Sequence, residues 1–352
     1  AASTGGQIMP PIMGAAAFIM AEMTGFDYSK IIVRAILPAF LYFLGIFLGV
    51  HFKAKKLGLK GLPREELPKW GKLLPKIYLL LPLVLLVYMI VSGQTMAKSA
   101  IYATIAAIAV SLINKDDRMT PTKFVNGLEN GGKNCISIGI ACGIAGIISV
   151  CITMTGLGGK LITYVVSLSN GHLIIALFLT MICCIVLGMG VPTTANYIIM
   201  ASTCAPILIN GMDMHVLAAN MFVFYFGIVA DITPPVALAA YAGSAIAKAP
   251  PMKTAFNATR LAIAAFIIPY IFAFNNAMIF VGDDVTVWSV ASITISATLG
   301  MLSIASGLMG YLIHDLKWIS RIALIAGGLL MIIPGTVSDL AGFAVLAAIF
   351  VL

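Results

Sequence analysis

The chain has 352 residues, of which 61% are hydrophobic and only 10% are charged, and its formal net charge is +8. Soluble proteins carry about 25% charged residues, so this composition excludes a soluble fold and predicts an all-α polytopic membrane protein. The lysines cluster in a few loops between apolar stretches. This clustering is typical of cytoplasmic loops, and it argues against a nucleic-acid partner.

Apolar segments follow one another along the chain and are separated by short loops. One span needs about 20 apolar residues, so the length allows about ten spans. In chain order, the predicted segments cover residues 7–24, 29–52, 76–92, 97–113, 134–155, 172–187, 191–210, 216–247, 257–281, 286–313, 318–334 and 337–352.

The lysine- and arginine-rich loops set the predicted orientation of the chain. Such loops remain in the cytoplasm, so 53–76, 114–133 and the stretch 248–260 are placed there. Segment 216–247 must then run inward. The stretch 156–171 is too short and too polar to span, and we expect it to lie along the outer interface as an amphipathic arm.

In this orientation, segments 172–187 and 191–210 together begin and end on the outer face. Two full crossings would satisfy this condition, and so would a re-entrant hairpin. The predicted tip, Leu187–Asn196, is glycine-rich and polar but carries no charge. Such backbone is tolerated at membrane depth only where it lines a cavity or is buried in protein. The tip sequence therefore favours the re-entrant hairpin. Membrane lipid is an expected partner of the whole protein.

Two Pro-Pro pairs interrupt apolar segments in similar contexts, at residues 6–18 and 230–241. Each has a polar, flexible entry, then Pro-Pro, then small residues that end in an aromatic. Proline lacks a backbone donor and interrupts a helix, so the freed carbonyls need a cation, a substrate or a neighbour. The first segment is predicted to run outward and the second inward. Inverted, interrupted helices are typical of secondary transporters, whereas a pair of packing kinks is the alternative interpretation.

Three motifs carry a resemblance to a known family. They are Gly-Gly-Gln-Ile-Met-Pro-Pro-Ile-Met-Gly at 5–14, Gly-Met-Gly-Val-Pro-Thr-Thr-Ala-Asn-Tyr at 188–197 and Asp-Ile-Thr-Pro-Pro-Val-Ala-Leu-Ala-Ala-Tyr at 231–241. Together they resemble the large membrane subunit of TRAP transporters (tripartite ATP-independent periplasmic transporters). The lysine-rich loop at 55–68 and the last spans, 286–352, resemble the fused permeases of the TAXI branch.

The resemblance implies an inverted-repeat, elevator-type secondary transporter in the bacterial inner membrane. A periplasmic solute-binding protein would deliver an organic acid of the dicarboxylate or 2-oxo acid class. A sodium or proton gradient would drive symport, and neither a cofactor nor an enzymatic activity is expected. The hairpin that matches the first Pro-Pro pair would precede Ala1, so we expect a longer permease whose amino-terminal part is a necessary partner. We expect the chain to divide into five parts. These are the broken helix of the first repeat (1–28), scaffold helices with the cytoplasmic loop (29–133), a scaffold helix with the interfacial arm (134–171), the transport domain of the second repeat (172–256) and the carboxyl-terminal helices (257–352).

The resemblance also implies the residues of the site. The first cation site would use groups of Gly188, Gly190, Val191, Pro192, Thr233 and Pro234. The second would combine the absent upstream hairpin with groups of Gly6, Gln7, Met9 and Pro10. The substrate or its cation would be contacted by Thr193, Thr194 and Asn196. A helix that begins near Thr193 would offer free N–H groups to a carboxylate. No metal other than sodium is expected.

Asp231 is a departure from the family pattern, because many members carry a neutral residue there. A carboxylate inside a membrane span is costly, and it is a functional hypothesis by default. Asp231 would ligate a cation or exchange the coupling proton. In the alternative interpretation, Asp231 caps the second half-helix with help from Thr233.

Other classes of function are less consistent with the sequence. An ion or small-solute channel with a re-entrant filter is the main alternative, but filters surround one pore with symmetric subunits, whereas the two tips here are unlike and inverted. The sequence contains neither His-Glu-x-x-His nor Gly-x-Ser-x-Gly, which argues against an intramembrane enzyme. It also lacks a phosphate-binding Gly-x-x-x-x-Gly-Lys-Ser/Thr loop, which argues against an ATP-driven pump.

Overall fold

A computed structural model describes most of the chain, and the described part is helical apart from turns and one isolated bridge. The described residues are 1–10, 13–61, 63, 67, 70–113, 118–282, 285–333 and 335–351. Pro11 of the first Pro-Pro pair lies outside them, as do several residues of the lysine-rich loop and Asp283-Asp284.

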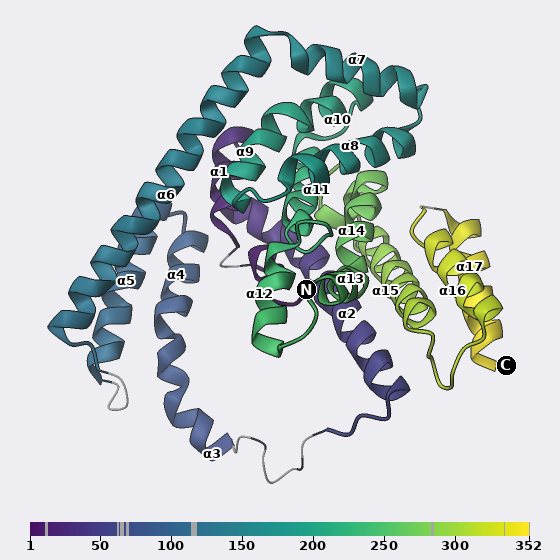
Figure 1. The fold of residues 1–352 in the computed structure, drawn as a ribbon, viewed down its shortest axis with the longest axis horizontal. Coiled ribbons are helices and arrows are strands. Elements are labelled where there is room, and N and C mark those ends of the chain that lie inside the picture. Colours follow the sequence, from purple (N-terminus) through teal and green to yellow (C-terminus); the bar gives the residue numbers. More distant parts are fainter. Residues whose placement is uncertain are drawn as a thin grey trace. The chain divides into compact units, whose positions relative to one another are not determined.

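The helices follow one another along the chain as labelled in Figure 1. Their bounds are η1 (Thr4–Gln7), α1 (Ala15–Thr24), α2 (Tyr28–Lys56), α3 (Trp70–Leu73), η2 (Leu74–Leu80), α4 (Leu81–Val91), α5 (Met96–Ile113), α6 (Pro121–Met154), α7 (Leu157–Ser169), α8 (Leu173–Gly188), α9 (Thr193–Thr203), α10 (Ala205–Met212), α11 (Val216–Ala230), α12 (Leu238–Ala247), α13 (Pro251–Leu261), α14 (Ile263–Phe274), η3 (Asn276–Ile279), α15 (Val287–Met309), α16 (Trp318–Leu330) and α17 (Thr336–Val351).

Five helical stretches of the described chain are long and apolar enough to cross a membrane. They are Tyr28–Lys56, Leu74–Val91, Thr193–Met212, Pro251–Phe274 and Val287–Met309. Shorter apolar helices account for most of the other predicted segments. The prediction of a helical, polytopic membrane protein is therefore confirmed, while the elevator arrangement stays a prediction.

The chain divides into two compact units. The first comprises residues 1–26, 31–59 and 141–352, and the second comprises 27–30 and 60–140. In the second unit, α4 packs against α5, and both helices expose large apolar side chains such as Val84 and Ile105. Such exposed faces are expected where lipid is the solvent.

The predicted loop at 114–133 is wrong over most of its length, because α6 begins at Pro121. The hydroxyl of Thr120 accepts a hydrogen bond from the backbone amide three residues later, at 3.3 Å. Proline suits the first position of a helix, and Thr120 therefore starts α6 as a cap. Glu129 and Lys133 add an ion pair one turn apart, at 2.5 Å. The basic residues of this stretch, and its position between two apolar segments, predict a loop.

Two other predicted segments can be compared with the helices of the structure. The stretch 156–171, predicted as an amphipathic arm, is helical as α7, with Val165 buried and Tyr164 exposed. Its position at the membrane interface stays a prediction. The predicted segment 257–281 is wrong at its amino-terminal boundary, because the helix already begins at Pro251. Proline at the first helical position explains this earlier start.

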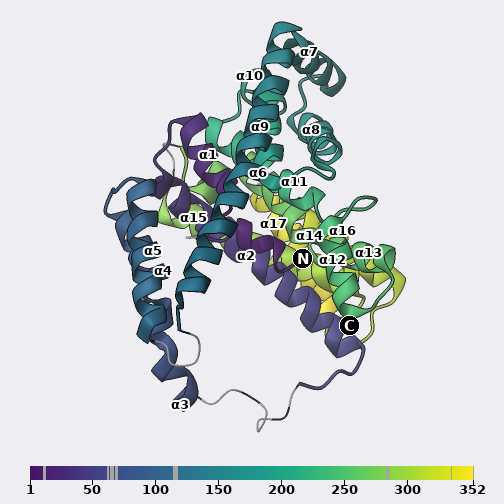
Figure 2. The ribbon, with the colours of Figure 1, turned by 60° about the vertical axis from the view of Figure 1, so that its left-hand side comes forward.

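The core of the first unit surrounds α11, which is apolar apart from Asn220 and is buried from Leu217 to Ala230. A helix that is hydrophobic all round is buried inside a larger bundle. Helices α8, α9, α10 and α14 pack around α11, as Figure 2 shows for the region of α8 to α11. Aromatic rings fill the contact with α14, where Phe222 and Phe226 each meet Tyr270 edge to face.

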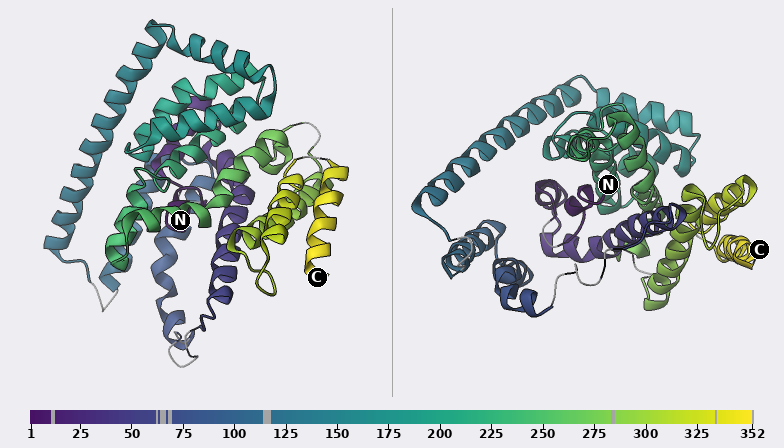
Figure 3. Two further views of the ribbon diagram at one scale, coloured as in Figure 1. Left: turned by 45° about the vertical axis from the view of Figure 1, so that its right-hand side comes forward. Right: turned by 60° about the horizontal axis from the view of Figure 1, so that its bottom comes forward.

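The three carboxyl-terminal helices pack through glycines. Helix α16 packs against both α15 and α17, and the three lie side by side in Figure 3. A Cβ atom added at Gly328 would lie 2.5 Å from the Ile304 side chain. One added at Gly342 would overlap the carbonyl oxygen of Gly327. Small residues allow this close backbone approach between membrane helices.

We expect Gly342→Val to destabilise the carboxyl-terminal helices by about 1–3 kcal/mol, because the new side chain has no room against α16. The measurement is the thermal unfolding temperature of the purified protein in detergent. Ala341→Val is the matched control, since Ala341 is the adjacent residue on α17 and is exposed. Equal unfolding temperatures for the two variants would contradict this packing.

Candidate functional site at the hairpin tip and the helix break

Helices α8 and α9 form the predicted hairpin. Helix α8 ends at Gly188, α9 begins at Thr193, and the two pack against each other and against α11. The turn between them requires a left-handed residue, which Gly190 supplies with φ of 77°. Glycine adopts this conformation without the penalty that a Cβ atom brings. The hairpin of two helices is thus confirmed, while its depth in the membrane stays a prediction.

The second Pro-Pro pair interrupts the helix as predicted. Helix α11 ends at Ala230, and α12 begins only at Leu238. Proline lacks the amide hydrogen that would continue the ladder, and Pro234 and Pro235 both lie in the interruption. The break is closed by a hydrogen bond from the Ala239 amide to the Asp231 carbonyl, at 3.0 Å.

The hairpin tip and the helix break lie side by side. The Thr193 hydroxyl donates to the Asp231 carboxylate at 3.4 Å, across 38 residues of sequence. A Cβ atom added at Gly190 would lie 3.7 Å from the Val236 side chain, and one added at Gly188 would lie only 2.9 Å from Ala230 Cβ. Four of the residues in these contacts belong to the predicted cation and substrate set. The structure therefore brings the two halves of the predicted site together.

Asn196 ties α9 to the last turn of α11. Its side chain is fully buried, and its amide nitrogen donates to the Gly227 carbonyl at 3.1 Å. That carbonyl is available because the Asp231 amide bonds to the Ile228 carbonyl, three residues back. The Asn196 side-chain oxygen is buried and finds no hydrogen-bond partner among the described residues. An unpartnered buried oxygen costs free energy, and a cation would offset that cost.

Sequence reasoning missed a second link between the same helices. The Tyr197 hydroxyl donates to the Asn220 side-chain oxygen at 2.8 Å, and both residues are buried. The Asn220 amide nitrogen in turn donates to the Val216 carbonyl at 2.9 Å. The available signal was Asn220 itself, because a polar side chain inside an otherwise apolar span marks an interhelical contact. No such signal marks Gly227.

The capping interpretation of Asp231 does not match the structure. The residue that precedes α12 is Ala237, and no side chain caps that helix. The Asp231 carboxylate contacts Thr193 on the hairpin tip. The Thr233 hydroxyl instead donates back to the Val229 carbonyl at 2.7 Å. The Asp231 side chain, half-buried and directed to the tip, is thus placed for the functional interpretation.

The other predicted tip and break residues surround this contact. Pro192 is exposed, and the others are half-buried: Val191, Thr194, Thr233 and Pro234. Thr194 follows Thr193 in the first turn of α9, where backbone N–H groups have no partner within the helix. The predicted substrate contact of these residues stays a prediction.

The first predicted interruption is also present, at residues 8–10 and 13–14 among those that the structure describes. A short helix, η1, precedes Ile8, and α1 begins only at Ala15. The Gly14 amide bridges the interruption by donating to the Gln7 carbonyl at 3.0 Å. Like Asn196, Gln7 has a buried side-chain oxygen with no hydrogen-bond partner in the described chain.

The four predicted residues of this first segment have different surroundings. Gly6 is exposed, and the others are half-buried: Gln7, Met9 and Pro10. Helix η1 packs against α11, the helix that ends beside Asp231. Both interrupted segments thus share α11 as a neighbour, and the role of the first as a cation site stays a prediction.

We expect Asn196→Ala to lower the stability of the protein by about 1–3 kcal/mol, because it leaves the buried Gly227 carbonyl without its donor. The thermal unfolding temperature of the purified protein measures this loss. Asn210→Ala is the matched control, since Asn210 is exposed on α10. The interhelical bond would be refuted if the unfolding temperature of Asn196→Ala were no lower than that of the control.

These features define a class of protein. A helical membrane protein in which a hairpin tip meets a Pro-Pro break in a buried helix has the architecture of a secondary transporter. Residues 1–284 match the family described as Tripartite ATP-independent periplasmic transporter, DctM component. Because the match covers most of the chain, the protein belongs to this family. A search of curated proteins finds no match to the chain.

Family membership settles several expectations. DctM proteins are multi-pass permeases of the inner membrane and are not enzymes. They work with a periplasmic binding protein and a small membrane subunit. Residues 285–352 lie beyond the family match, and the resemblance to the fused TAXI branch stays a prediction.

Proposed function

We propose that the protein imports an organic acid, of the dicarboxylate or 2-oxo acid class, in symport with sodium. The coupling cation binds where the hairpin tip meets the helix break. The observation that carries this proposal is the contact between Thr193 and Asp231, which joins the two elements through a hydroxyl and a carboxylate. The binding protein of the family would deliver the acid from the periplasm.

The chemistry of the contact supports a sodium ion. Hard cations are bound by oxygen ligands, and a carboxylate offsets the charge of a cation inside a span. Asp231 offers the carboxylate, Thr193 offers a hydroxyl oxygen, and Asn196 has a buried oxygen that lacks a partner among the described residues. A proton would need only the carboxylate, so the neighbouring neutral oxygens favour sodium.

The start of α9 supports an anionic substrate. The first backbone N–H groups of a helix lack partners within it, and the helix dipole favours a negative charge there. Thr193 and Thr194 occupy this first turn and are half-buried. A carboxylate of the substrate would bind this turn while sodium binds on the Asp231 side.

An elevator movement is the proposed means of transport. Helices α8, α9 and α11 pack against one another and would move as one body that carries the site across the membrane. The alternative function, a channel with a re-entrant filter, is opposed by membership of a family of secondary transporters.

The test is uptake by the complete permease, with its small subunit, in proteoliposomes supplied with the binding protein. Radiolabelled dicarboxylates and 2-oxo acids are offered while sodium and pH gradients are imposed separately. The proposal expects accumulation of one acid class under an inward sodium gradient and no accumulation without a gradient. Accumulation under a pH gradient alone would show that the coupling ion is the proton and not sodium. Downhill flux that needs neither the binding protein nor a gradient would contradict symport.

A further inference from the structure

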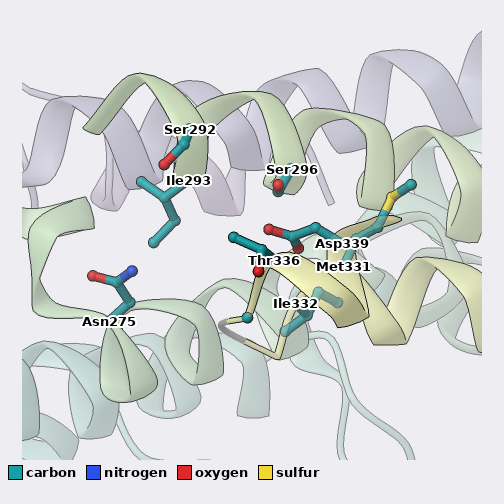
Figure 4. A pocket seen from close by; sticks show the side chains of 9 residues that line it. Asn275, Ser292, Ile293, Ser296, Met331, Ile332, Thr336 and Asp339 are labelled. Carbon is teal, nitrogen blue, oxygen red and sulfur yellow. The ribbon is translucent and has the colours of Figure 1, made fainter. Parts of the chain in front are cut away.

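A polar cavity lies among the carboxyl-terminal helices, beyond the family match. It has a volume of about 210 Å³ and lies among the end of α14, the first turns of α15 and the start of α17. Figure 4 shows that the Asp339 carboxylate of α17 and the Ser296 hydroxyl of α15 face each other across it. The lining residues are Asn275, Ser292, Ile293, Ser296, Met331, Ile332, Gly335, Thr336 and Asp339.

The lining selects the charge of an occupant. It contains one carboxylate and three hydroxyls, and it contains no lysine, arginine or histidine. An anion such as an organic acid would meet the Asp339 carboxylate with no cation to offset the repulsion. The volume is also below the roughly 300 Å³ at which pockets for small organic ligands begin. A small cation fits both the charge and the size.

The oxygen atoms favour a hydrated monovalent metal ion. The Ser296 hydroxyl interacts with the Asp339 carboxylate, so the two groups already converge on one place. The Asn275 side-chain oxygen accepts from the Ala277 amide at 3.1 Å, which leaves its NH₂ group for water. One water needs about 30 Å³ of liquid volume, so several complete the shell. Divalent ions favour several carboxylates, and no group of three acidic, histidine or cysteine side chains occurs in the described chain.

The position of Asp339 in its helix does not by itself explain the cavity. Asp339 lies in the first turn of α17, where the helix dipole stabilises a carboxylate. That effect needs only an exposed side chain at the helix start. Ser292 and Ser296 lie one turn apart on α15, opposite this turn, and they make the lining polar on both sides. A structural hydrogen bond between the helices would account for Ser296 alone, and it leaves the hydroxyl oxygens of Ser292 and Thr336 in the lining.

The orientation predicted from the basic loops places the cavity nearer to the periplasmic side. The other end of α15 is bound by basic side chains: Arg321 Nε donates to the Gly307 carbonyl at 2.9 Å, and Lys56 Nζ to the Gly310 carbonyl at 3.2 Å. Basic residues mark the cytoplasmic face. Ser296 lies 13 residues before the end of α15 at Met309, or about 20 Å along the helix. Ions of the periplasm therefore have the shorter path to Asp339.

We propose that Asp339 and Ser296 bind a hydrated monovalent metal cation, with sodium as the principal occupant, at a site separate from the hairpin tip. The site is formed where α15 and α17 lie next to each other. Both helices belong to the part of the chain that lies outside the family match.

The test is equilibrium binding of sodium-22 to the purified permease with its small subunit, in lipid nanodiscs with choline as the background cation. Asp339→Asn is expected to bind one sodium ion fewer per chain than the wild type. Ser296→Ala keeps the carboxylate, and it is expected to lower the affinity for that sodium ion by roughly three- to tenfold. Asp213→Asn is the matched control, because Asp213 is an exposed turn residue.

Each outcome decides the proposal. An unchanged number of bound sodium ions in Asp339→Asn, with the control at wild-type level, overturns it, as does binding in Ser296→Ala at wild-type affinity. If Asp339→Asn does not fold, Asp339→Glu is measured in its place. The proposal then requires that Asp339→Glu still binds the sodium ion and that Ser296→Ala binds this ion with lower affinity. The stoichiometry separates this site from the hairpin tip, because Asp231→Asn must leave the Asp339-dependent ion bound.

Discussion

Asp231→Asn is expected to lower sodium-driven uptake at least about tenfold, because it removes the only charge that the tip–break contact offers a cation. A hydrogen bond or ligand contact to a charged group contributes about 1.5–3 kcal/mol, which corresponds to roughly 10–100-fold in cation affinity. The Thr193 hydroxyl can still bond to the asparagine oxygen, so the fold is expected to survive. Initial uptake rates at several sodium concentrations measure the effect.

The control for this variant is Asp213→Asn. Asp213 has φ of 53°, a left-handed conformation that asparagine also tolerates, and its side chain is exposed. The Asp213→Asn variant loses the same charge, but at a turn away from the site, so uptake by this variant should equal that of the wild type. Uptake by Asp231→Asn at the wild-type rate and with unchanged sodium dependence would remove Asp231 from the coupling site.

Gly188→Val is expected to abolish most uptake and to destabilise the hairpin by about 1–3 kcal/mol, the usual cost of overpacking. A Cβ atom at Gly188 would lie 2.6 Å from the Asn196 amide nitrogen and 2.9 Å from Ala230 Cβ. The Asn196 amide is held by the Gly227 carbonyl, so it cannot yield without losing a buried hydrogen bond. The hairpin tip must therefore move away from the helix break. Uptake and unfolding temperature are measured together.

Gly243→Val is the control for this substitution. A Cβ atom at Gly243, on the surface of α12, would meet no atom within 4 Å. Valine there changes helix propensity only slightly and should leave both uptake and unfolding temperature near those of the wild type. The packing of the tip against α11 is refuted if Gly188→Val behaves like Gly243→Val.

The sequence predicted those parts of the site that depend on local chemistry. Pro234 and Pro235 lack amide hydrogens wherever they occur, so an interruption of the helix near residues 230–235 follows from the sequence alone. The turn at Gly190 is similar, because only glycine adopts its conformation cheaply. Asp231 stood out because an acid inside an apolar span is rare.

Contacts between distant segments could not be predicted in the same way. Gly227 has no side chain, and its carbonyl becomes a partner for Asn196 only because the helix tightens before the break. Asp339 and Ser296 belong to separate helices, α17 and α15, each of which packs against α16 through glycines. Their pairing depends on tertiary structure, which residue spacing along one helix does not encode.

The start of α6 shows a different limit. Thr120 followed by Pro121 is a helix-start signal that the sequence displays openly. The basic residues of the stretch instead predicted a cytoplasmic loop. A polar helix can be stable through ion pairs such as Glu129 with Lys133, so charge content alone does not distinguish a loop from a helix outside the membrane.

Hydrogen exchange of the purified permease, followed by mass spectrometry with sodium or with choline, tests the central claim that the hairpin tip and the helix break form one cation site. The claim predicts that sodium slows exchange at 189–196 and at 231–239 together, because one ion joins both segments. The exposed stretch at 57–61, which lies outside both segments, should exchange at the same rate in both salts. Slowing confined to one of the two segments, or found in neither, would contradict the claim.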